Sequence, residues 1–203
     1  PGEDLEAIGL LPGGHQIRLT GPAAVQFLLD GLEIEGQSGL HPVQHHPVGA
    51  VANGVHGASI VAVQAALTAA GAIACIIAPR PGPINTADGE SIEATATLEN
   101  SPPVLFDALV LPDGSDGVAL LAKHGQTQEF VTNQYRHGKT ILALGAAKAL
   151  LEKAGITNTL ASGQPDPGIV LAGVDTLDDG AEAFIAAVGQ HRHPARETDP
   201  PKI

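Results

Sequence analysis

From residue 47 onward, short apolar runs alternate with segments of helical hydrophobic period. Apolar runs predict strands at residues 48–52, 72–78, 108–111, 140–144 and 168–172. Helical periodicity predicts helices at residues 58–70, 126–137, 146–154 and 178–189. The strand runs are continuously apolar rather than alternating, so we expect both faces of their sheet to be covered. Residues 91–98 alternate weakly and predict a hairpin or an edge strand.

Strands that alternate with helices predict an α/β fold. Right-handed crossovers then give a doubly wound, mostly parallel sheet flanked by helices, in a flavodoxin-like arrangement. Ligands of such sheets bind beyond the carboxyl ends of the strands. The loops in which a site is expected are residues 53–57, 79–89, 112–117 and 145–147.

The chain divides into three predicted parts. Residues 1–46 are rich in glycine, proline and histidine and predict a linker or arm with one short helix at residues 22–32. Residues 47–190 carry the strand and helix pattern and predict the folded domain. Residues 191–203 are polar and rich in proline, so we expect a tail with its histidines, including His193, on the surface.

Composition narrows the class of function. The chain has 203 residues and a net charge of −12, which disfavours nucleic acid as a partner. It has neither a long apolar span nor a basic amphipathic segment, so no membrane association is predicted. The single cysteine fits a reducing compartment, and we expect the cytoplasm. A first residue of proline rather than methionine indicates an excised or processed piece.

Strand 140–144 runs directly into a helix through Gly145, Ala146 and Ala147. A strand-to-helix elbow of this kind can present a nucleophile at a helix N-terminus. These three residues supply no thiol, hydroxyl or carboxylate, so the elbow is predicted to be vestigial and the chain to have no catalytic residue of its own. Cys75 lies inside an apolar run and is predicted to be a buried structural cysteine.

Three histidines are weak candidates for a metal site. His41, His45 and His46 lie within six residues of one another, and imidazole is a common ligand of zinc and nickel. They lie in a proline-flanked loop without helical spacing, and no nearby acidic residue or cysteine completes a ligand set. We therefore predict solvated histidines and no bound metal or other cofactor, with a metal-binding module as an open alternative.

Residues from about 47 to the C-terminus resemble the C-terminal domain of large-subunit haem catalases, a branch of the class I glutamine-amidotransferase-like superfamily. The resemblance rests on the order and spacing of residues 88–97, 106–114, 130–145, 191–196 and 200–203. Catalytic relatives carry Cys at the elbow and a supporting carboxylate after the first strand. Here the elbow begins with Gly145, and residues 53–56 read Asn-Gly-Val-His.

The resemblance implies that peroxide chemistry and the haem belong to the core domain of a parent catalase. Tyr135 lacks the family's haem-binding signature, so no haem-ligating role is expected for it. The implied role is to stabilise a homotetramer and shape access to the haem, by contact with the catalase core and sister subunits. A chaperone-like role toward unfolded client proteins is also implied. A free-standing amidotransferase-like hydrolase with an unrecognised nucleophile remains an alternative.

Overall fold

The computed structural model describes residues 6–10, 16–20 and 44–198, which fall into two units. The first contains strands β1 (Glu6–Leu10) and β2 (Gln16–Thr20), which pair as an antiparallel hairpin. Hydrophobic periodicity did not predict this hairpin. The helix predicted at residues 22–32 lies outside the described residues, as does His41. The second unit begins at Gln44 and carries the rest of the fold.

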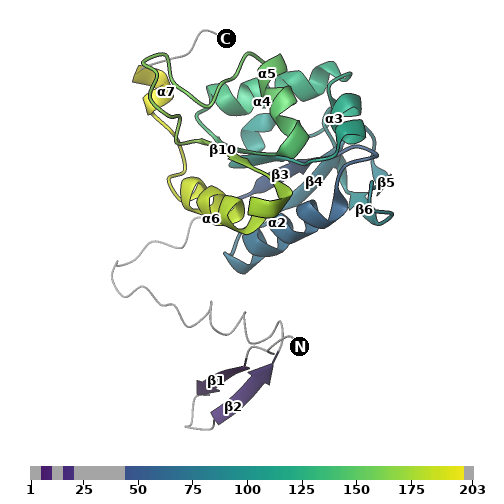
Figure 1. Cartoon of the computed structure of the whole chain (residues 1–203), viewed down its shortest axis with the longest axis vertical. Helices are drawn as coiled ribbons and strands as arrows, with labels where there is room; N and C mark the ends of the chain where they lie inside the picture. Colours follow the sequence, from purple (N-terminus) through teal and green to yellow (C-terminus); the bar gives the residue numbers. More distant parts are fainter. Residues whose placement is uncertain (1–5, 11–15, 21–43, 199–203) are drawn as a thin grey trace. The chain divides into compact units, whose positions relative to one another are not determined.

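The second unit is built on a parallel sheet. Six of the described strands form it, in the spatial order β10-β9-β8-β3-β4-β7 (Figure 1). Their bounds are β3 (Pro47–Ala50), β4 (Cys75–Ala78), β7 (Ala96–Thr97), β8 (Ala108–Leu111), β9 (Thr140–Leu144) and β10 (Ile169–Ala172). Each neighbouring pair is parallel. Because the chain winds outward from β3 in one direction and from β8 in the other, these two central strands flank the topological switch point.

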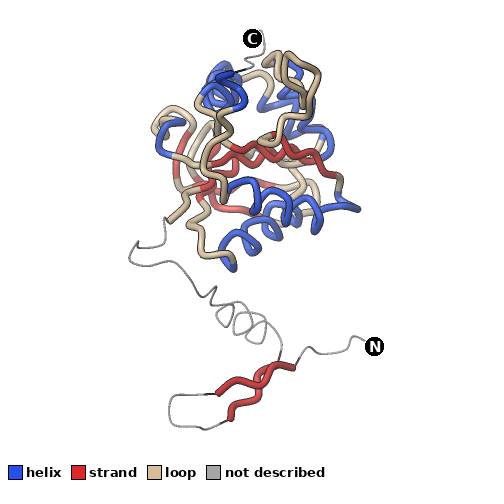
Figure 2. Tube along the Cα trace, turned by 90° about the vertical axis from the view of Figure 1, so that its left-hand side faces the viewer, coloured by secondary structure: helices blue, strands red, loops and turns tan. Residues whose placement is uncertain are grey.

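Helices cover both faces of this sheet, as Figure 1 and Figure 2 show. Helices α2 (Gly57–Ala69) and α6 (Leu177–Val188) pack on one face. Helices α3 (Ser115–Leu121), α4 (Gly125–Arg136) and α5 (Lys148–Lys153) pack on the other. Each face has its own aliphatic cluster of buried residues. The predicted doubly wound α/β fold is therefore confirmed.

Two short elements differ from the sequence prediction. The loop predicted at residues 79–89 contains β5 (Gly82–Asn85), which pairs antiparallel with β6 (Ser91–Ala94). The loop predicted at residues 112–117 contains the start of α3, at Ser115. Both segments are glycine-rich, and tertiary packing overrides the local preference for turns. Short 3-10 turns form at η1 (Pro103–Leu105), η2 (Gly145–Ala147) and η3 (Val174–Thr176).

The prediction that His193 lies on the surface is wrong. Helix α7 (Ala195–Thr198) follows α6, and the side chains around it enter the core. His193 is only 3% exposed and Arg196 only 5%. Arg196 pairs with the buried Asp166, through Nε to Oδ2 at 2.7 Å and Nη2 to Oδ1 at 3.0 Å. A charge so deeply buried requires a partner, and the partner lies 30 residues away in the sequence.

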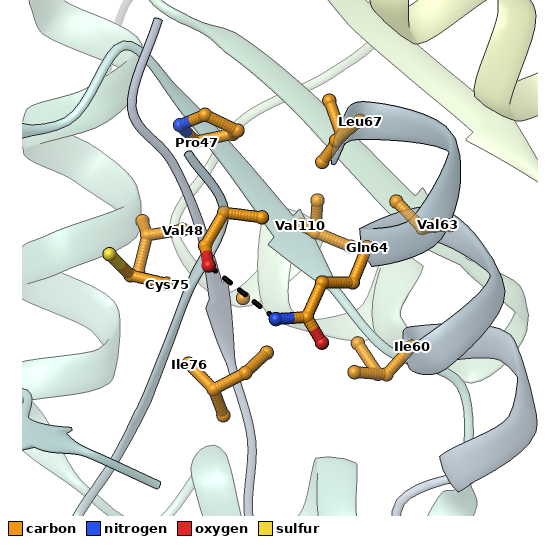
Figure 3. Close-up of a pocket in the computed structure, with 11 residues that line it drawn as sticks. Pro47, Val48, Ile60, Val63, Gln64, Leu67, Cys75, Ile76 and Val110 are labelled. Atoms are coloured by element: carbon orange, nitrogen blue, oxygen red, sulfur yellow. Dashed lines mark hydrogen bonds between the residues drawn. The ribbon is translucent and has the colours of Figure 1, made fainter. Parts of the chain in front are cut away.

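Packing between α2 and the sheet leaves almost no free space. The cavity drawn in Figure 3 lies between α2 and strands β3 and β4, and its interior volume is about 10 Å³. This is room for about one water molecule. Gln64 closes it by donating from Nε2 to the Ala74 carbonyl at 3.5 Å. The cavity is too small for a substrate and reflects ordinary core packing.

Cys75 also departs from expectation, because it is half-buried rather than fully buried. It is the first residue of β4 and packs against the cluster that includes α4 and α5. Figure 3 shows its sulfur directed away from Gln64 and α2. The residue lies at the amino end of its strand, whereas ligands of parallel sheets bind at the carboxyl ends.

Candidate functional site

The elbow predicted from the sequence forms where β9 ends. Gly145 has φ +50°, in the left-handed region, and is exposed. A Cβ atom added at Gly145 would overlap the carboxylate of Asp113, which comes from the loop after β8. The strained geometry of a nucleophile elbow is therefore present, but the position that a nucleophilic side chain would occupy is filled by another residue.

The Asp113 carboxylate also accepts a hydrogen bond from the backbone N–H of Ala146 in the elbow. Its Oδ1 atom accepts from the Ala146 N–H at 2.8 Å and from the Gly114 N–H at 2.7 Å. In hydrolase elbows, the N–H that follows the nucleophile is one of the donors that stabilise a developing oxyanion. Here that donor already faces a carboxylate, which excludes an oxyanion from the same place. At this elbow, neither the space for a nucleophilic side chain nor a free N–H donor for an oxyanion is present.

The crevice at the switch point is closed by backbone packing. The loops after β3 and β8 approach so closely that a Cβ atom on Gly114 would overlap the carbonyl oxygen of Gly54, and one on Gly117 would overlap Val55. The His56 N–H donates to the carbonyl oxygen of Asp113 at 2.8 Å. A doubly wound sheet binds ligands in this crevice, and here the two loops occupy it themselves.

The N-terminus of α2 is capped from within the chain. Its N–H groups at Gly57 and Ala58 donate to the Asp88 carboxylate at 3.0 and 2.8 Å. The N-cap His56 accepts from the Ser59 N–H through Nδ1 at 3.3 Å. Contacts with the Thr86 side chain and with these backbone donors hold the pKa of Asp88 well below its ordinary range. The glycine-rich turn at residues 53–57 thus serves as a helix cap, and its N–H groups are not free to bind phosphate.

The structure groups His45 with potential metal ligands that differ from those predicted from the sequence. His45 lies beside Asp107 and His191, with one potential ligand atom from each residue within 4.8 Å of the others. His46 contributes its backbone N–H, which donates to Asp107 Oδ2 at 2.9 Å. Asp107 and His191 were not considered as ligands, because they are 62 and 146 residues distant from His45 in the sequence.

Tyr135 does not fit a role as a haem ligand. Its side chain is buried, and the Arg196 guanidinium lies over its ring, 4.2 Å from the centroid. Burial, with a smaller effect of the Asp166 carboxylate, raises the pKa of Tyr135 to about 12. A phenol that is enclosed by protein and resists deprotonation is unsuited to ligating iron. Within the described residues, Tyr135 is a core residue.

Comparison with known families decides the relationship. A family model for the C-terminal domain found in long catalases matches residues 47–198. The chain belongs to this family. The chain is similar to catalase HPII of Pseudomonas putida, at 32% identity over 152 residues, covering 72% of this chain and 19% of that protein. It also resembles catalase C of Rhizobium meliloti, at 35% identity over 147 residues, covering 71% of this chain and 19% of that protein.

The chain therefore spans about a fifth of the length of these relatives. Solved structures confirm the fold. A mutant of a DJ-1 superfamily protein from Salmonella typhimurium superposes with a TM-score of 0.63 at 20% identity, covering 76% of this chain and 96% of that one. Drosophila melanogaster DJ-1beta gives 0.62 at 17% identity, covering 73% and 95%. At these identities the likeness concerns the fold alone. Within the described residues, no helix is long and apolar enough to cross a bilayer.

The residue that sequence reasoning missed is Asp113. It lies in one of the loops where a site is expected, but Pro-Asp-Gly is a common turn sequence and no role was predicted for its side chain. The available signal was its place immediately after β8, in a strand adjacent to the elbow strand. In a parallel sheet, the carboxyl ends of neighbouring strands lie together, so Asp113 and Gly145 could have been placed side by side.

Proposed function

We propose that this chain is a non-catalytic C-terminal domain of a long catalase, in which decomposition of hydrogen peroxide takes place at a haem held by the rest of the protein. The observation that carries the proposal is the filled elbow, where the Asp113 carboxylate overlaps the position of any side chain at Gly145 and accepts from Ala146. With its elbow occupied and its switch-point crevice packed, the domain retains a scaffold suited to protein contacts.

The contacts in the parent would be made with the catalase core and with sister subunits of a homotetramer, and they would shape access to the haem. Exposed apolar residues support such packing. Val104 and Leu105 of η1 are 66% and 64% exposed, and Pro102 precedes them. Burial of these side chains would be favourable in an assembly. The same apolar surface would serve a chaperone-like role toward unfolded proteins, and the parent would be cytoplasmic.

The absence of chemistry in the domain is tested on the chain itself. After incubation with haem and removal of the unbound haem by gel filtration, the purified chain should show no Soret absorbance and no peroxide turnover above buffer. Activity-based probes for serine and cysteine hydrolases should leave it unlabelled. Turnover that survives removal of trace metals, or stoichiometric probe labelling, would contradict the proposal and revive the hydrolase alternative.

The assembly role is tested on the parent catalase. We compare the full enzyme with a form that ends before residue 47 and with the full-length Val104→Asp/Leu105→Asp variant, using light scattering for mass and residual turnover after heating. We expect the truncated form, and to a smaller degree the variant, to lose tetramer and heat resistance. A matched exposed change, Glu152→Gln, should have no effect. Unchanged mass and heat resistance in the truncated form would refute the role.

A further inference from the structure

We propose that His45, Asp107 and His191 form a binding site for a divalent cation of the zinc class. The three residues lie just before β3, just before β8 and just after α6. Their potential ligand atoms lie within 4.8 Å of one another. Two imidazoles with one carboxylate form a ligand set that zinc accepts, with a fourth position left for water. The site is independent of the function proposed above.

Asp107 is held in place for this role. Its Oδ2 atom accepts from the His46 N–H at 2.9 Å, and its Oδ1 atom accepts from Lys139 Nζ at 3.0 Å. The His46 N–H fixes the orientation of the carboxylate, and a hydrogen bond that orients a ligand in this way raises metal affinity.

The structure gives one further observation for each histidine. The Nδ1 atom of His45 is buried and has no hydrogen-bond partner among the described residues. His191 has φ +62°, and it is the only non-glycine residue with a left-handed backbone among the described residues. Its Nδ1 atom lies 3.9 Å from Asp107 Oδ1, and its ring centroid lies 6.0 Å from that of His45. A bound cation would coordinate the facing nitrogens, and strained backbone is common where side chains serve a site.

The ligand set also selects the metal. Calcium and magnesium require oxygen ligands, of which this site offers one carboxylate. Imidazole nitrogen favours zinc, nickel and cobalt. The Lys139 ammonium shares Asp107 Oδ1 and would repel a cation, so it weakens the site without removing a ligand. Because the Lys139 ammonium repels the cation, a substitution that removes this charge is expected to increase the affinity for the metal ion.

The experiment uses the full untagged chain and titrates it with Zn²⁺ by calorimetry and with Co²⁺ by visible absorption, with Mg²⁺ as the control ion. We expect one saturable Zn²⁺ site and a Co²⁺ spectrum typical of tetrahedral nitrogen and oxygen ligands. His45→Ala and His191→Ala should each weaken Zn²⁺ binding by about 10-fold or more. Lys139→Met should strengthen it several-fold. His124→Ala, a change at an exposed histidine outside the cluster, should leave it unchanged.

Circular dichroism establishes that each variant is folded before titration. If His45→Ala does not fold, the exposed His191→Ala variant carries the comparison. Zinc binding that is equal in His191→Ala and the wild type would place the ion elsewhere and overturn the proposal. Failure of both the wild type and Lys139→Met to bind Zn²⁺ at millimolar concentration would overturn it as well. Neither outcome bears on the assembly role, which is measured on the parent catalase.

Discussion

Gly145 and Asp113 lie against each other at the carboxyl end of the sheet. The glycine is required twice, by its left-handed backbone and by the carboxylate that occupies the space of its Cβ atom. Asp113 in turn satisfies the N–H groups of Gly114 and Ala146. These contacts make the elbow a structural joint between the loops that follow β8 and β9.

Substitution of Gly145 should be costly for two separable reasons. A left-handed non-glycine residue costs about 1–2 kcal/mol, and overlap with Asp113 adds about 1–3 kcal/mol. We expect Gly145→Ala to lower the free energy of unfolding in urea by about 2–5 kcal/mol. Gly163→Ala is the matched control, because Gly163 has φ +84° with nothing within 4 Å of an added Cβ. Equal losses in the two variants would show that Asp113 does not oppose a side chain at position 145.

His193 should make stability depend on pH. Burial, and then the nearby Arg196 charge, lower the pKa of His193 in the folded chain, while Asp166 acts in the opposite direction. The unfolded chain therefore binds this proton at higher pH than the folded chain does. The stability associated with neutral His193 is complete above the ordinary histidine pKa of about 6.5 and decreases as the pH falls toward the lowered folded value.

Urea denaturation between about pH 5 and pH 8 measures this dependence, over a window that includes the ordinary histidine pKa. We expect His193→Gln to flatten the curve, because glutamine does not titrate and can still pair with the Thr140 hydroxyl, which lies 2.8 Å from His193 Nε2. The pKa of Asp107 is lowered in the folded chain, so protonation of Asp107 affects stability only below about pH 4. The effects of His193 and Asp107 therefore fall in separate pH ranges. An unchanged slope in His193→Gln would contradict the assignment.

The position of helix α7 depends on the contacts of one side chain, Arg196. Arg196 donates to both oxygens of Asp166 and, through Nη1, to the carbonyl oxygens of Tyr135 and Lys139. Its guanidinium also covers the Tyr135 ring. The segment after α6 is thereby attached to the end of α4 and to the loop before β10.

Removal of Arg196 should destabilise the domain strongly. Arg196→Met leaves the Asp166 carboxylate buried without its partner, which costs about 3–5 kcal/mol. Lysine is a poor replacement because it cannot reproduce the bidentate geometry. Arg192→Met is the control, because Arg192 pairs with Glu197 at the surface and such pairs contribute about 0–1 kcal/mol. Thermal and urea unfolding measure both variants, and similar losses would contradict the role of the buried pair.

At the scale of the whole molecule, the folded core belongs to the second unit. The two aliphatic clusters lie on opposite faces of one sheet and draw their residues from β3 onward. The first unit contributes a separate hairpin, β1 and β2. The stability of the sheet and its helices should therefore not depend on the first unit.

A chain limited to Gln44–Ile203 should fold with the same urea midpoint as the full chain. The retained unit contains the buried clusters and the Asp166–Arg196 pair, and it keeps the residues of the proposed metal site. Circular dichroism and urea titration compare the two chains. A midpoint lowered well beyond measurement error would show that residues 1–43 stabilise the core.

The sequence predicts the sheet well because local patterns specify it. The bounds of β8 and β9 agree with the apolar runs, and glycine marks the end of α5. It does not predict the pairing of distant polar residues. The burial of His193 depends on Asp166 and Arg196, which meet only in the folded chain. The filled elbow depends on Asp113 in the same way, because a turn sequence does not indicate what its side chain contacts.

The joint between Asp113 and Gly145 also affects which mutational routes are open to the gene. A codon change that introduces a nucleophile at position 145 meets the carboxylate and the left-handed backbone together. A change that removes Asp113 first leaves the Ala146 N–H without its acceptor and adds no nucleophile. Each first step is expected to lower stability, so a nucleophile at this elbow would require coupled substitutions at positions 113 and 145.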